Sequence, residues 1–149
     1  MRRLALALLL LLPITACGQP VPPEVKDVWT RDSVGGRANA AVFMTIRSQT
    51  PDRLIAASAP VAQRTDLMTM TSGSGAMGMR YVDGIDIPAG TPVSLNPTGL
   101  HVWLADLNQP LRAGQSFPLT LEFENAGRRQ VTVSVIGPAA APPVSGMTM

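Results

Sequence analysis

The stretches Leu119-Thr-Leu-Glu-Phe-Glu124 and Val131-Thr-Val-Ser-Val-Ile136 decide the fold, because in both of them apolar and polar residues alternate. Successive side chains of a β-strand point to opposite faces, so each stretch predicts a strand with one buried and one solvated side. Outward from these stretches, short apolar and β-branched runs fill residues 25–136. Gly, Pro, Asn or Asp interrupts the runs roughly every ten residues, a spacing typical of an all-β sandwich or barrel. We expect strands at residues 25–30, 40–47, 54–57, 65–71, 76–81, 92–95, 101–104, 117–124 and 130–136.

The composition excludes several classes of protein. A chain of 149 residues suits one domain with a leader and a tail. Charged residues make up 15% and aromatic residues 4%, which disfavours a nucleic-acid-binding protein. The sequence contains one His and one Cys, too few for a Cys/His zinc site, a blue-copper centre or an intrachain disulfide. Because a single His leaves little to do acid–base work, we expect a protein that is not an enzyme. We also expect it to be a monomer.

The N-terminal residues 1–16 have the features of a secretory signal peptide. Arg2 and Arg3 precede an apolar run at residues 4–12, which is too short for a membrane span of about 20 residues. Ile14-Thr-Ala-Cys17 resembles the bacterial lipobox, which implies acylation of Cys17. Gly18 then favours the outer membrane of the bacterial envelope, and residues 17–24 form a Pro-rich tether. The alternative is a secreted protein with an unpaired Cys.

Methionines cluster in the middle and at the end of the chain. A hairpin with its tip at residues 72–75 predicts pairs whose residue numbers sum to 147, which places Met68 opposite Met79 and Met70 opposite Met77. Residues at i and i+2 share a face of a strand, so the four thioethers would share one face. The two clusters comprise Met68, Met70, Met77 and Met79, and then Met147 and Met149.

These side chains favour a soft metal ion. Thioether and imidazole ligands select Cu(I) over Mg²⁺, Ca²⁺ or Mn²⁺. In the oxidising periplasm thioethers also avoid the disulfide formation that threatens Cys ligands. The alternative is that the Met residues fill gaps in the core and that His101 is structural.

Four residues follow one another at characteristic intervals: ten residues separate Met68 from Met79, twenty-one separate Met79 from His101, and one separates His101 from Trp103. This spacing resembles the signature of the periplasmic copper chaperone PCu(A)C family. Supporting phrases include Ile87-Pro-Ala-Gly90 and Gly99-Leu-His101. The resemblance covers nearly all of residues 25–136, which we take as the domain. It implies a cupredoxin-like Greek-key β-sandwich that binds one Cu(I) and passes it to a respiratory oxidase subunit or assembly factor, toward the CuA or CuB centre.

The family's ligands carry over to Met68, Met79 and His101. Two positions depart from the commonest pattern: Met68 stands where His is most frequent, and Trp103 stands where a Met should be. A metal-free or copper-scavenging envelope lipoprotein, a degenerate paralogue of the chaperone, is the alternative function. We expect residues 137–149 to form a flexible tail. Auxiliary candidates for the metal are Met70, Met77, Trp103, Met147 and Met149.

Overall fold

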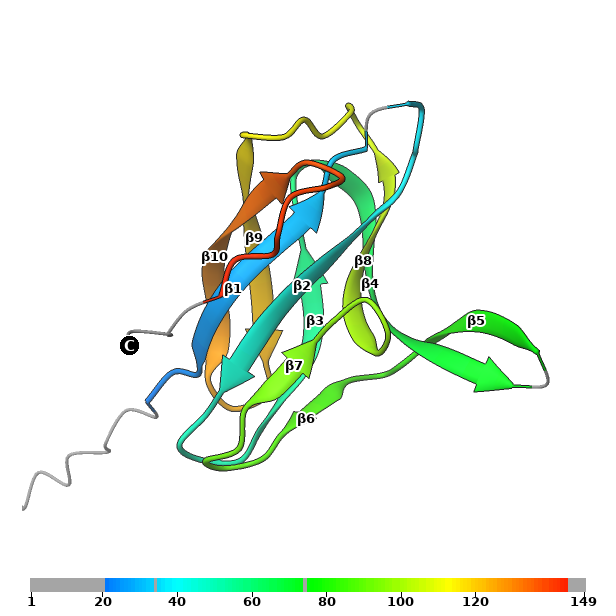
Figure 1. Ribbon diagram of the computed structural model, residues 1–149. Helices are drawn as coiled ribbons and strands as arrows, with labels where there is room; N and C mark the ends of the chain where they lie inside the picture. Colours follow the sequence, from blue (N-terminus) through cyan, green and yellow to red (C-terminus); the bar gives the residue numbers. More distant parts are fainter. Residues whose placement is uncertain (1–20, 34, 74, 145–149) are drawn as a thin grey trace, which may run out of the picture.

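The computed structural model describes residues 21–33, 35–73 and 75–144, which form ten strands and no helix (Figure 1). Consequently this part of the chain offers no apolar helix long enough to cross a bilayer. Cys17, Met147 and Met149 lie outside the described residues. The strands are β1 Glu24–Arg31, β2 Ala40–Arg47, β3 Asp52–Ser58, β4 Ala62–Gly73, β5 Ala76–Tyr81, β6 Ile85–Ile87, β7 Val93–Leu95, β8 Leu100–Leu107, β9 Ser116–Phe123 and β10 Gly127–Ile136.

All nine expected strands are present, and β6 is the one that the sequence did not predict. This strand has only three residues, between Gly84 and Pro88. So short a run carries no recognisable alternation. It pairs with β3 at one end of the sheet.

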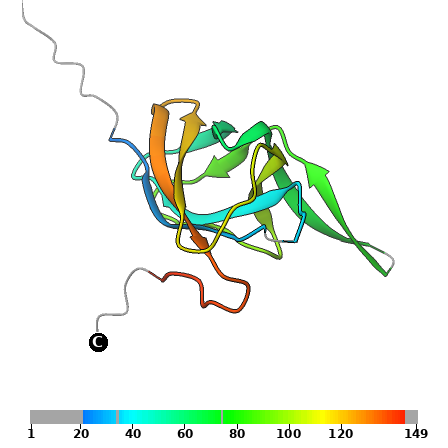
Figure 2. The ribbon, with the colours of Figure 1, turned by 90° about the horizontal axis from the view of Figure 1, so that it is seen from above.

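The strands form one hydrogen-bonded sheet in the order β5-β4-β8-β2-β1-β10-β9-β3-β6, with β7 also pairing with β2. All named strand pairs are antiparallel except β1 with β10, which is parallel. The sheet folds over itself, so that β10, β1 and β2 form a layer in front of β9 and β3 (Figure 1). Figure 2 shows the layers from above, and the buried side chains of the core lie between them. The expectation of an all-β sandwich is confirmed.

The core follows the alternation of the sequence. Leu119 and Leu121 on β9 have no exposed surface, whereas Thr120 and Glu122 between and beside them are partly exposed. Burial of each such leucine stabilises the fold by about 1.5–3 kcal/mol. Met44 on β2 is 2% exposed and belongs to the same core.

A β-bulge in β1 places Trp29 on the outer face of the sheet. The pairing of β1 with β2 shifts between Lys26 and Trp29, and Asp27 within the bulge has a positive φ of 53°. An extra residue reverses which side chains face inward. Trp29 therefore pairs with Phe43 on the outer side, and the two ring centroids lie 4.6 Å apart.

The β4–β5 hairpin projects from the sandwich (Figure 1), and its register corrects the expected sum of 147. The observed pairs sum to 149: Met70 lies opposite Met79, and Met68 lies opposite Tyr81. The ladder ends at the pair of Gly73 with Ala76 and not at Thr71 with Ala76, two residues further along β4 than expected, because Gly75 adopts the positive φ of 88° that a tight turn needs. A shift of two preserves the faces, so the four clustered methionines still share one.

Candidate metal centre

His101 and Met68 are direct cross-strand partners in the ladder between β8 and β4. Side chains of such partners stand on the same face, with Cβ atoms about 4.5–5.5 Å apart. Both residues are buried: His101 is 2% exposed and Met68 is 5% exposed. An imidazole and a thioether therefore share a site from which bulk water is excluded.

The hydrogen bonding of His101 leaves one ring nitrogen free. Nδ1 lies 3.0 Å from the carbonyl oxygen of Gly99. A carbonyl only accepts, so Nδ1 carries the proton and Nε2 carries the lone pair. Nε2 is buried and has no hydrogen-bond partner. An imidazole held by Nδ1–H to a backbone carbonyl, with Nε2 open, is the arrangement that metal-binding histidines use.

The other three methionines of the first cluster, Met70, Met77 and Met79, lie on the same two strands as this site or on the neighbouring β5. Met70 follows Met68 on the same face of β4, and its backbone N–H donates to the carbonyl of Gly99 across a distance of 3.1 Å. Met79 lies opposite Met70 and hence diagonal to Met68, within reach of a long side chain. Met77 lies one step further toward the hairpin tip. We call Met68, Met70, Met77 and Met79 the thioether face.

Aromatic rings line the other side of His101. The ring of Phe43 is 6.3 Å from the imidazole, and the indole of Trp103 is 6.2 Å from it in an edge-on arrangement. Trp103 lies on the same face as His101, as expected from their spacing. Arg31 stacks over Trp29 at 5.2 Å and donates hydrogen bonds to the carbonyl oxygens of residues 137 and 140, both at 2.8 Å.

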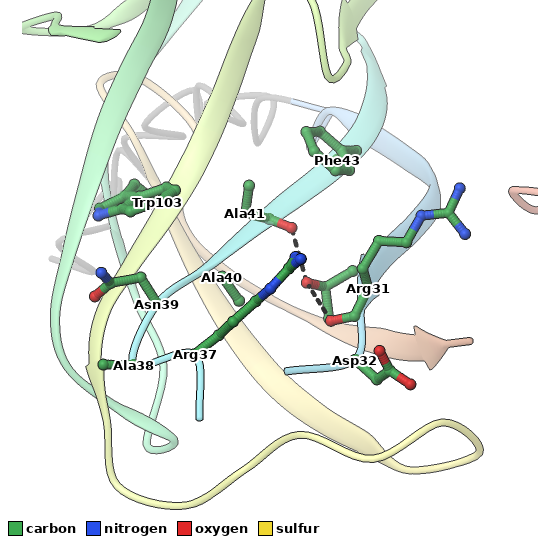
Figure 3. A pocket seen from close by; sticks show the side chains of 10 residues that line it. Arg31, Asp32, Arg37, Ala38, Asn39, Ala40, Ala41, Phe43 and Trp103 are labelled. Atoms are coloured by element: carbon green, nitrogen blue, oxygen red, sulfur yellow. Dashed lines mark hydrogen bonds between the residues drawn. The ribbon is translucent and has the colours of Figure 1, made fainter. Parts of the chain in front are cut away.

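A cleft of about 420 Å³ lies beyond Trp103, between β8, the beginning of β2 and the β1–β2 connection (Figure 3). Phe43 and Trp103 belong both to its lining and to the surroundings of His101. The two rings therefore separate the cleft from the imidazole.

Hard ligands do not converge on this site. The described part of the chain contains no group of three or more His, Cys, Asp or Glu side chains able to hold a metal ion. Asp66 is the register partner of Trp103, and its carboxylate accepts a hydrogen bond of 2.9 Å from Arg64 Nε. That hydrogen bond raises the pKa of the exposed Arg64 guanidinium above its ordinary value. The ligands available around His101 are thus one nitrogen and several sulfur atoms, which suit a soft monovalent ion.

The structure brings the three carried-over ligands, Met68, Met79 and His101, onto one face, with Met70 among them. Sequence reasoning missed the partner of Nδ1. A Gly two residues before a His on a strand was the available signal, but a backbone carbonyl contact depends on the turn that precedes β8. It also missed Tyr81, which lies opposite Met68.

Comparisons with known proteins agree with this architecture. A relative from Leifsonia xyli subsp. xyli, described as a "Putative lipoprotein", is 27% identical over 141 residues, covering 85% of this chain and 84% of the relative. The family described as "Putative lipoprotein LpqE-like" matches residues 24–135.

Solved structures of copper-binding proteins share the fold. The copper-bound PCuAC domain of PmoF2 superposes with a TM-score of 0.64 at 25% identity, covering 80% of this chain and 96% of that domain. The Cu(I) form of DR1885 from Deinococcus radiodurans gives a TM-score of 0.63 at 28% identity, covering 83% of this chain and 85% of that one. The apo PCuAC domain of PmoF1, at 23% identity, gives 0.68, covering 80% of this chain and 97% of that domain. The cupredoxin-like fold is confirmed, and the chain belongs to the LpqE-like lipoprotein family.

Proposed function

We propose that this protein is a Cu(I) carrier of the bacterial envelope. The observation that supports it most directly is the buried, unpartnered Nε2 of His101 beside the thioether of Met68. An unsatisfied polar atom in a core costs about 1–3 kcal/mol. A lone pair kept at that cost next to sulfur is suited to a soft ion.

The proposed ligands are His101 Nε2, Met68 and Met79, with Met70 in reach as a fourth. Thioethers carry no charge and do not titrate, so they bind Cu(I) without trapping a harder ion. The indole of Trp103, whose ring centroid is 6.2 Å from that of the imidazole, adds apolar cover on this face. This interpretation draws on the copper-bound structures with the same fold.

Release of the ion occurs by ligand exchange. An acceptor's ligands replace the thioethers one at a time, so copper is never free and its oxidation state does not change. The protein contributes no catalytic group to this exchange. The acceptor that the PCu(A)C resemblance implies is a respiratory oxidase subunit or assembly factor, at the CuA or CuB centre.

Membership of a lipoprotein family supports a lipid anchor, which we assign to Cys17. The anchor would hold a monomeric carrier at the periplasmic side of the outer membrane. The Pro-rich residues 17–24 would separate the sandwich from the lipid.

A competition titration with a chromogenic Cu(I) chelator under reducing conditions tests the function. We expect one equivalent of Cu(I) to bind and His101→Gln to weaken binding sharply. Met44→Leu removes a thioether from the core, away from the site, and should leave the affinity unchanged. Absence of Cu(I) binding by the wild type would favour the metal-free envelope lipoprotein. Binding without transfer to an oxidase CuA domain would favour copper scavenging.

A further inference from the structure

The outward side of β5 carries a row of exposed apolar side chains. Met77 is 69% exposed, Met79 is 47% exposed and Tyr81 is 61% exposed. These residues alternate along the strand and so share one face. Single exposed apolar residues need no explanation, but a contiguous row on a projecting strand marks an interaction site.

Exposure decreases stepwise along the thioether face toward the imidazole. Met77 near the hairpin tip is the most exposed, Met79 is about half exposed, and Met70, directly opposite Met79, is partly buried. Met68 and then His101 follow, at 5% and 2%. Each residue in this series lies opposite, diagonal to or two positions from the next one, so a continuous path of soft ligands leads from solvent to Nε2.

The opposite face of the hairpin is different in character. There Thr69 pairs with Arg80, and Thr71 Oγ1 donates a hydrogen bond of 3.2 Å to the carbonyl of Gly78. The four sulfur atoms are thus all on one face, which also carries Ser72 near the hairpin tip, and the other face carries Thr69, Thr71 and Arg80. Methionines that only filled gaps in the core would not gather on one face of the hairpin. In addition, an exposed methionine fills no gap.

We propose that Met70, Met77 and Met79 form an outer thioether site that captures a soft monovalent ion and relays it to Met68 and His101. This inference rests on the proposed carrier function and adds a route for the ion to that function. In each step the ion forms a bond to the next sulfur or nitrogen ligand before its bond to the previous ligand breaks, and no electron or proton is transferred. Delivery runs along the same path in reverse, from the buried imidazole to the projecting β4–β5 hairpin, where an acceptor can reach the ion.

Methionine-methyl NMR tests the outer site. The full mature chain, labelled at the methionine methyl carbons, is titrated with Ag(I) as an air-stable analogue of Cu(I). We expect the first equivalent to move the methyls of Met68 and Met79 and the His101 ring nitrogens, and a second equivalent to move the methyls of Met70 and Met77. The methyl of core Met44 is the internal control and should not move. The titration is repeated with Met147 and Met149 both replaced by Leu, so that ions on the tail are not mistaken for the outer site.

Transfer kinetics test the relay. Met77→Leu removes one thioether of the outer site and should leave the Cu(I) affinity of the buried site at Met68 and His101 within twofold of wild type. It should slow copper transfer to a competing chelator by about tenfold, equivalent to ~1.4 kcal/mol in the barrier. Met44→Leu, which removes a thioether from the core, should transfer copper at the wild-type rate.

Two results would overturn the relay: a Met77 methyl that stays in place up to two equivalents, or wild-type transfer by Met77→Leu. Failure of the carrier function itself is visible separately. In that case the His101 ring nitrogens do not respond to the ion, and the relay falls with it even if the Met77 methyl shifts.

Discussion

Replacement of His101 by phenylalanine should cost the apo protein no stability, although the residue is almost fully buried. The substitution removes the unpartnered Nε2 and so relieves a desolvation cost of about 1–3 kcal/mol. It also removes the hydrogen bond from Nδ1 to Gly99, worth about 0.5–1.5 kcal/mol. The phenyl ring retains aromatic contacts with Phe43 and Trp103. The difference is a net gain of about 1 kcal/mol in the free energy of unfolding.

Thermal unfolding without Cu(I) measures the stability of the apo variant, and thermal unfolding with Cu(I) measures how much the ion stabilises it. For a domain of this size a gain of ~1 kcal/mol raises the melting temperature by about 4 °C. Cu(I) at about 100 times its Kd should stabilise the wild type by ~2.7 kcal/mol. The variant should show almost none of that stabilisation. Phe43→Leu is the matched control, because it alters the same aromatic row and leaves every proposed ligand in place.

Destabilisation of apo His101→Phe by more than about 1 kcal/mol, with a Phe43→Leu control that folds normally, would show that His101 is a structural residue with a satisfied ring. Full stabilisation of the variant by Cu(I) would show that another group is the nitrogen ligand.

Four further outcomes follow from the same geometry. Cys17→Ser should move the mature protein from the membrane to the soluble periplasmic fraction, since a chain without acylation has no anchor; membrane association that persists would contradict this. Met68→Ala and Met79→Ala should each weaken Cu(I) binding sharply and add little in combination, since they act on one ion; small additive losses in a chelator competition would indicate packing roles. Cu(I) affinity, titrated against pH, should fall by no more than about tenfold per pH unit on acidification, because only the imidazole among the ligands takes up a proton; a steeper fall would require a further titrating ligand. Trp103→Met should tighten Cu(I) binding. In a Trp29→Phe background, Cu(I) should quench the fluorescence of Trp103, because the indole face attracts a cation by about 0.5–2 kcal/mol. Neither effect should occur if the indole only packs.

Features set by local periodicity could be predicted from the sequence. The alternation in residues 119–124 and 131–136 correctly identified β9 and β10, because every second side chain of a strand points to the same face. The shared face of the four methionines was also predictable, because a two-residue shift of register preserves it. The partner assignment was wrong, because Ser72-Gly-Ser-Gly75 accommodates more than one turn and the φ of Gly75 selects among them.

Features set by distant parts of the chain could not be predicted. The bulge around Asp27 moves Trp29 to the outer face, and nothing in the local pattern at that point indicates an extra residue. The state of Nε2 depends on the carbonyl of Gly99 and on the packing of β4 against β8. Spacing alone could suggest His101 as a ligand, but only the fold shows that one nitrogen is occupied and the other is free.

The proposed ligands lie on parts of the fold with different freedom to move. His101 is on β8, which has hydrogen-bonded strands on both sides, so the imidazole is fixed by the sandwich. Met77 and Met79 are on β5, an edge strand whose residues are all exposed, and such strands open locally at little cost in free energy. Exchange of a sulfur ligand on β5 therefore need not disturb the core, whereas movement of His101 would disturb its pairing with Met68 in the ladder between β8 and β4. In the proposed carrier, an acceptor that approaches β5 would take the ion by stepwise exchange of these sulfur ligands, and the sandwich would stay folded.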